Sequence, residues 1–149
     1  MVLKGKKIKN KNVATKFIGC LTKKGKKVTA QKLFSKSIQN TCKNLKIKSG
    51  ILMKKIVQNL GVIVELRKVK IRRNTYLVPI PVNSQRRGYT IIKRILNATS
   101  KNLLKTALHN KLYKELISVA MRKDSSSIAE KTQMLKEAYK NKSNMHFRW

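Results

Sequence analysis

A proline-containing stretch, NTYLVPIPVNSQRR at positions 74–87, constrains the fold more than any other part of the sequence. It holds both prolines of the chain. Proline fixes its own φ and pushes the residue before it toward an extended backbone. Tyr76, Val78, Ile80 and Val82 recur at every second position, which is the period of a β-strand. The sequence up to about residue 60 and after this stretch has helical periodicity. One extended segment, ending in an arginine pair, therefore interrupts a helical chain.

Apolar side chains at i, i+3 and i+4 spacing predict six helices around this segment. Glycines at 25, 50 and 61 separate the first three. Thr29 and Ser84 are the expected N-caps of the second and fourth helices, and the serines at 125–127 resemble a capping box for the sixth. We expect helices at about 13–21, 29–47, 51–60, 84–100, 102–121 and from these serines to 141.

Residues 62–70 also alternate in character, and they pair naturally with residues 75–82 across a turn near 72–74. The expected fold is therefore mainly α, with a six-helix, bundle-like core and a β-hairpin arm at about 62–82 between the third and fourth helices. An isolated hairpin is only marginally stable in water, so this arm must lean on the helical body or on a ligand. We expect a basic N-terminal arm at residues 1–12 and one helical domain at 13–149.

Positive charge dominates the composition. The chain carries 37 Lys and Arg against 5 Asp and Glu, a net charge of +32. Repulsion of this size destabilises a compact state unless a polyanion stays bound. Nucleic acid is the first candidate partner and an anionic membrane surface the second. The apolar helix faces are expected to be used by a shared core, which argues against the membrane.

The sequence offers no constellation that supports catalysis. The five acidic residues are scattered, the two histidines are isolated, and no phosphate-binding glycine loop is present. We therefore predict no enzyme activity, no metal site and no cofactor. Cys20 and Cys42 are too isolated for a zinc site, and both are expected to be small core residues.

Four blocks of the sequence resemble a known family. The first comprises KFI at 16–18, GKK at 25–27 and TA at 29–30, and the second is the spacing from Asn59 to Tyr76. The third is the run TYLVP at 75–79 with Val82 and the arginine pair at 86–87. The fourth is the ending HFRW at 146–149. In these blocks the chain resembles ribosomal protein seven of the small subunit, bacterial and organellar type, over roughly residues 13–149. The resemblance implies six helices and a hairpin arm, in agreement with the periodicity.

The resemblance also implies a role. Family members bind the 3′ major domain of small-subunit ribosomal RNA, organise assembly of the head, and lie beside ribosomal protein eleven. They are found near the mRNA exit and the exit-site tRNA, so tRNA and mRNA are further candidate partners. A non-specific nucleoid or RNA-chaperone protein remains an alternative that explains the charge but not the hairpin motif or the ending.

Basic residues in the turn after the first helix, along the arm and at the start of the fourth helix are the expected contacts with ribosomal RNA. The predicted site comprises Gly25, Lys26, Lys27, Arg67, Lys70, Arg72, Arg73, Arg86, Arg87, Lys93, Arg94, Arg148 and Trp149. Neutralising phosphates releases condensed counterions, so affinity is expected to fall steeply with salt.

The sequence departs from the family at the tip of the arm. Arg72 and Arg73 stand where the family usually has a glycine pair, so a looser turn is expected there. Lysine outnumbers arginine 29 to 8, and Asn and Ile are also frequent. This bias toward AT-rich codons, together with the bacterial type of the family, suggests a mitochondrial ribosome. A plastid or the cytoplasm of an AT-rich bacterium is the alternative.

Overall fold

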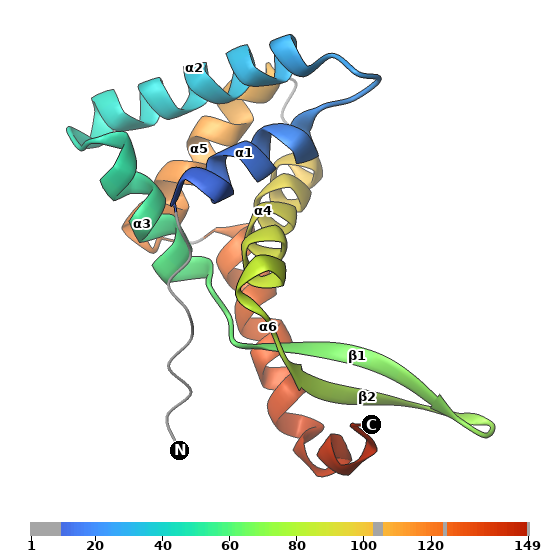
Figure 1. The fold of residues 1–149 in the computed structure, drawn as a ribbon. Coiled ribbons are helices and arrows are strands. Elements are labelled where there is room, and N and C mark those ends of the chain that lie inside the picture. Colours follow the sequence, from blue (N-terminus) through green and yellow to red (C-terminus); the bar gives the residue numbers. More distant parts are fainter. Residues whose placement is uncertain (1–9, 103–105, 124, 149) are drawn as a thin grey trace.

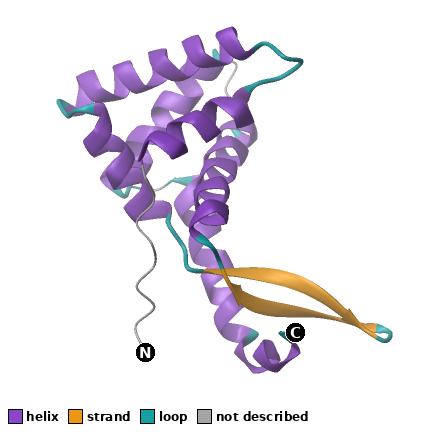
Figure 2. Cartoon of the chain, in the orientation of Figure 1, coloured by secondary structure: helices purple, strands orange, loops and turns teal. Residues whose placement is uncertain are grey.

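The computed structural model describes residues 10–102, 106–123 and 125–148. Within these ranges the chain forms six α-helices, a short 3-10 segment and one antiparallel hairpin, which confirms the predicted fold class (Figures 1 and 2). The elements are α1 Asn10–Leu21, α2 Lys27–Leu45, α3 Ser49–Leu60, β1 Val64–Ile71, β2 Asn74–Pro81, α4 Ser84–Lys101, α5 Leu108–Met121, α6 Ser126–Lys140 and η1 Lys142–Phe147.

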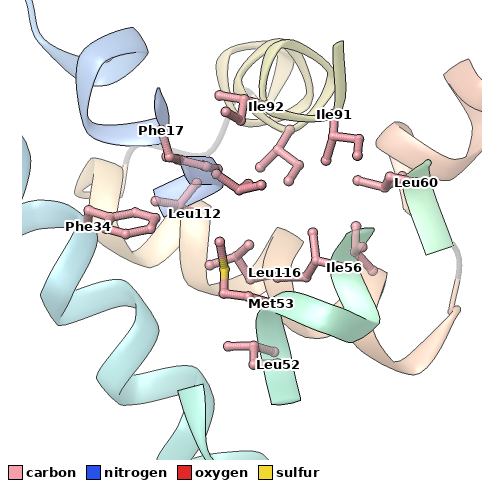
Figure 3. Packing of buried hydrophobic residues seen from close by; sticks show 13 residues of the cluster. Phe17, Phe34, Leu52, Met53, Ile56, Leu60, Ile91, Ile92, Leu112 and Leu116 are labelled. Atoms are coloured by element: carbon pink, nitrogen blue, oxygen red, sulfur yellow. The ribbon is translucent and has the colours of Figure 1, made fainter. Parts of the chain in front are cut away.

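The hydrophobic core lies between α1, α2, α3, α4 and α5 (Figure 3). Phe17 of α1 stacks on Phe34 of α2, with 4.8 Å between the ring centroids. Leu60 and Ile92 are fully buried, and each buried side chain of this size contributes about 1.5–3 kcal/mol to folding. Many of the apolar positions that gave the helical periodicity meet here, but Leu108, Leu135 and Tyr139 are exposed.

The helix ends differ from the sequence expectation in detail. The N-cap of α4 is Asn83, whose side chain accepts a hydrogen bond from the backbone N–H of Ser84 at 2.7 Å, and Ser84 is already helical. Helix α2 begins two residues before Thr29, whose hydroxyl donates to the carbonyl of Lys26. Of the three serines predicted to start α6, Ser125 is the N-cap and accepts from the N–H of Ile128 at 3.1 Å, while Ser126 and Ser127 are already helical.

Two further expectations are corrected. Helix α5 begins at Leu108 rather than at residue 102, and residues 103–105 of the expected helix lie outside the described ranges. Cys20 is exposed and Cys42 is half-buried, so the prediction that both belong to the core is wrong for Cys20. Burial raises the pKa of the Cys42 thiol, which is the behaviour of a packed, unreactive cysteine.

The arm is a regular two-stranded ribbon with a tight tip. Val64 pairs with Pro81 at its base and Ile71 with Asn74 at its end, so only Arg72 and Arg73 form the turn. The looser turn expected from the missing glycines is therefore wrong. Instead Arg72 adopts a left-handed backbone conformation, with φ of 52°, which a residue with a Cβ atom adopts at a cost of roughly 1–2 kcal/mol.

The arm leans on the C-terminal part of the chain. In Figure 1 it leaves the helical body where α3 ends and α4 begins, and η1 lies beneath it. The ring of Tyr76 on β2 packs against Phe147 at 5.0 Å, and Asn144 donates to the carbonyl of Leu77 at 3.3 Å. These contacts turn Tyr76 toward the protein and give Phe147 a packing role.

The strained tip gives a first prediction. Asparagine tolerates the left-handed conformation better than arginine, so Arg72→Asn is expected to raise the free energy of unfolding by about 0.5–1 kcal/mol. Urea denaturation followed by circular dichroism measures this change. Arg73→Asn removes the same charge at a position without a positive φ, and equal stabilisation by both variants would show that relief of charge, not of backbone strain, is responsible.

Candidate nucleic-acid interface

Helix α4 carries the predicted basic residues as two stripes on adjacent faces, an outer stripe of Arg86 and Lys93 and an inner stripe of Arg87 and Arg94. Arg86 and Lys93 lie seven residues apart and are exposed, with exposed Tyr89 between them. Arg87 and Arg94 are also seven residues apart, but Arg87 is half-buried and Arg94 is buried. Seven residues are nearly two helical turns, so each pair shares one face. The outer stripe is available to a ligand along a helix of about 27 Å.

At the start of the outer stripe an ion pair fixes Arg86 against the base of the arm. Its Nε and one terminal nitrogen donate to the two carboxylate oxygens of Glu65 at 3.0 and 2.9 Å. The guanidinium also lies 5.3 Å from the centre of the Tyr89 ring. This is the one ion pair within the described residues, and 56% of the Arg86 side chain remains exposed. Arg86 is therefore both held in place and accessible.

The same ion pair changes how both groups titrate. The hydrogen bonds from Arg86 hold the pKa of the Glu65 carboxyl below its usual value, although partial burial opposes this. The carboxylate in turn raises the pKa of Arg86. Glu65 therefore stays ionised, and its ion pair with Arg86 holds the base of the arm against α4.

The arm extends this basic surface away from the body. Arg67, Lys70, Arg72 and Arg73 are all exposed along it. Eight residues per strand carry it about 26 Å from its base to its tip. The arm can therefore contact a ligand well outside the helical body.

At the opposite end of α4 the structure places the basic turn between α1 and α2. Gly25, Lys26 and Lys27 are exposed there, and Gly25 has a φ of +73° that favours glycine. A groove of about 420 Å³ connects this turn to α4, with Lys23 and Lys26 on one side and Asn97 and Ser100 on the other. One cationic surface, with gaps, therefore follows α4 and comprises the basic turn, the outer stripe and the arm.

Arg94 requires a correction, because it does not reach this surface. Only 6% of it is exposed, and one terminal nitrogen donates to the carbonyl of Leu60 at 3.3 Å. Burial lowers the pKa of Arg94, while Glu130 and Glu65 partly offset the cost of its charge. Arg87 is half-buried beside Gly61, where an added Cβ would lie 2.6 Å from an Arg87 nitrogen. Both arginines belong to the interior side of α4.

Two cations that the sequence analysis did not single out, half-buried Lys131 and exposed Arg122, lie near these arginines. Lys131 of α6 donates to the carbonyl of Asn59 at 2.6 Å, and Arg122 donates to the Asn59 side-chain oxygen at 2.8 Å. The last carbonyls of a helix lack intrahelical partners and carry the negative end of its dipole. Lys131, Arg94 and Arg122 thus gather at the end of α3, where the arm begins. Their long separation in sequence left no local signal for this cluster.

The remaining predicted residues lie at the chain end and at the surface of α1. Arg148 is exposed, whereas Trp149 lies outside the described residues. Lys16, which was quoted only as part of a motif, donates to the backbone carbonyl of Gln85 at 3.3 Å and ties α1 to the first turn of α4. It extends the basic surface on the side of α1.

The described residues include neither a metal-ion site nor a membrane-spanning helix. No group of three or more His, Cys, Asp or Glu side chains that could hold a metal ion occurs among them. No described helix is both long and apolar enough to cross a bilayer.

Comparison with known proteins identifies the family. The family model for ribosomal protein S7p/S5e matches residues 1–142. This chain belongs to the ribosomal protein S7 family. It is 32% identical over 140 residues to the small ribosomal subunit protein uS7m of Reclinomonas americana, covering 94% of this chain and 87% of that protein.

Bacterial members of the S7 family are similar at nearly the same level. The protein uS7 of Sulfurovum sp. is 31% identical over 137 residues, covering 92% of this chain and 87% of its own. That of Desulforapulum autotrophicum is 29% identical over 141 residues, covering 95% and 90%. The chain is therefore a structural, non-enzymatic protein of the small ribosomal subunit, which acts in translation together with small-subunit RNA and other ribosomal proteins.

The Glu65–Arg86 pair of this S7-family protein leads to a pH prediction. The folded-state pKa of Glu65 is lowered, so its stabilisation is present above the unfolded-state pKa and is lost as pH falls through the folded value. Thermal unfolding from pH 6 to pH 3 should therefore show a larger loss of Tm in the unaltered protein than in Glu65→Gln. Parallel curves for the two proteins would contradict a stabilising ion pair.

Proposed function

We propose that this S7-family protein binds directly to the 3′ major domain of small-subunit ribosomal RNA and organises assembly of the head. The observation that carries the proposal is the cationic surface along α4. A surface of this kind suits folded RNA, because double-stranded RNA is recognised mainly through its phosphates and the shape of its grooves. The exposed predicted contacts are Lys26, Lys27, Arg67, Lys70, Arg72, Arg73, Arg86, Lys93 and Arg148, with the backbone of Gly25.

The placement in the ribosome extends this proposal. The arm, with both arginines at its tip, would reach toward the exit-site tRNA and the mRNA exit, and ribosomal protein eleven would be a neighbour. The compartment we propose is the mitochondrial matrix, supported by the similarity to a uS7m protein and by the lysine-rich, AT-biased composition. The bacterial relatives have comparable identity, so sequencing the gene's genomic context provides the direct test of this assignment.

The central experiment compares two RNAs of equal length. Binding to isolated 3′ major domain RNA and to an unrelated folded RNA is measured by filter retention between 50 and 300 mM salt. We expect affinity for both to fall with salt because counterions are released, with the 3′ domain preferred at moderate salt. Equal affinity for the two RNAs at moderate salt would support a non-specific nucleic-acid-compacting protein instead.

Adjacent residues on α4 provide a matched pair of variants. Lys93→Met removes an exposed cation of the outer stripe and should reduce the salt slope by about 0.7–0.9 for one lost phosphate contact, with Tm unchanged. Arg94→Met removes a buried cation and leaves the Leu60 carbonyl without its donor, so we expect it to cost about 1–3 kcal/mol of stability. At temperatures where Arg94→Met is folded, its salt slope should be unchanged. If both variants alter RNA binding equally, the division into two stripes has no functional meaning.

A further inference from the structure

A pocket of about 540 Å³ lies at the base of the arm, between β1, the end of β2 and the first turn of α4. In Figure 1 the strands leave the helical body next to the start of α4. Leu66, Ile80 and Val82 supply apolar lining, while Glu65, Asn83 and Arg86 supply polar groups. All of these residues belong to the described chain.

The chemistry of this pocket differs from that of the rest of the cationic surface. A phosphate needs donors only, and an acidic side chain repels it. Here one of the five acidic residues of a +32 chain lines the pocket. A nucleobase, in contrast, needs apolar surface for its faces and both donors and acceptors for its edge. The combination of lining residues therefore suits a base better than a phosphate.

Two groups in the pocket are already fixed in position. Glu65 holds Arg86 through two hydrogen bonds of 2.9 and 3.0 Å, and Tyr89 lies 5.3 Å from the guanidinium. A planar guanidinium held in this way is a surface on which a base can stack. Each carboxylate oxygen of Glu65 keeps a further lone pair beside its bond to Arg86. That lone pair can accept a hydrogen bond from an amino group.

We infer that this pocket receives a single unpaired RNA base that carries an exocyclic amino group, with Arg86 stacking on the base and Glu65 accepting from the amino group. Guanine, adenine and cytosine have such a group, and uracil has none. Two further cations, Arg67 and Lys68, also line the pocket and add positive charge that attracts the phosphates of the same RNA strand. This inference rests on the proposed RNA binding and adds one base-specific contact to a surface otherwise suited to the backbone.

The test uses the full chain bound to 3′ major domain RNA. Unpaired bases are probed on their Watson–Crick edges with dimethyl sulfate for adenine and cytosine and with kethoxal for guanine. The unaltered protein is expected to protect one unpaired base through this pocket. Glu65→Gln should restore the reactivity of that base alone, because loss of a charge-assisted hydrogen bond lowers the docked population about tenfold.

Two further variants separate this role from a structural one. Glu137→Gln removes the same charge on α6, where Glu137 accepts from Gln133 at 3.1 Å, and should leave every protection in place. Ile80→Thr reduces the apolar lining but leaves the ion pair intact, and should expose the same base as Glu65→Gln.

The outcomes are distinguishable. If Glu65→Gln removes protections all along the arm, the ion pair only holds the arm in place and the pocket inference is wrong. Unchanged protections in both Glu65→Gln and Ile80→Thr would also overturn the inference while leaving RNA binding established. If the unaltered protein protects no base and shows no preference for the 3′ domain, the proposed function itself fails.

Discussion

Repulsion between cations is the constraint to which the rest of this structure responds. With five acidic residues for 37 basic ones, most cations can have no acidic partner within the chain. The acids that the structure describes are used at defined places. Glu65 fixes Arg86 at the base of the arm, and Glu115 accepts from the backbone N–H of Ser127 at the start of α6. Glu130 lies close enough to Arg94 to offset part of its charge. Each of these acids stabilises a junction between elements.

The C-terminal end of α3 is a further junction between elements. Asn59 receives Lys131 on its backbone carbonyl and Arg122 on its side chain, and it donates to the carbonyl of Val119 at 2.8 Å. It therefore links α3 to α5 and α6 five residues before the first strand of the arm begins at Val64. Desolvation lowers the pKa of Lys131, and the neighbouring arginines lower it further. Bringing these cations together costs electrostatic free energy, but the cluster satisfies helix-end carbonyls that would otherwise be buried without donors.

Sequence periodicity predicted the helices and the hairpin because burial of apolar side chains decides both. The prediction failed where a basic residue was assigned to the RNA surface from its charge alone, without regard to the helical face on which it lies. Arg94 was assigned to the RNA surface because it is basic and lies in a basic helix, yet Ile91 and Ile95 place that position on the buried face. The tip of the arm was expected to be loose without glycine, but strand pairing up to Ile71 and Asn74 holds Arg72 in a left-handed conformation. The pocket beside Glu65 depends on contacts between residues about twenty positions apart, which no local pattern encodes.

The neighbouring arginines at 86 and 87 show how little freedom α4 has to change length. Successive residues on a helix are rotated by about 100°, so the outer and inner stripes are distinguished by a single position. Inserting or deleting one residue between Arg87 and Lys93 would turn the later half of each stripe away from its first half. After an insertion, Lys93 would take the buried place of Arg94 and Ile92 would face the ligand. After a deletion, Arg94 would face the ligand and Ile95 would take its buried place. We therefore expect related chains to tolerate substitutions in this helix far more readily than insertions or deletions.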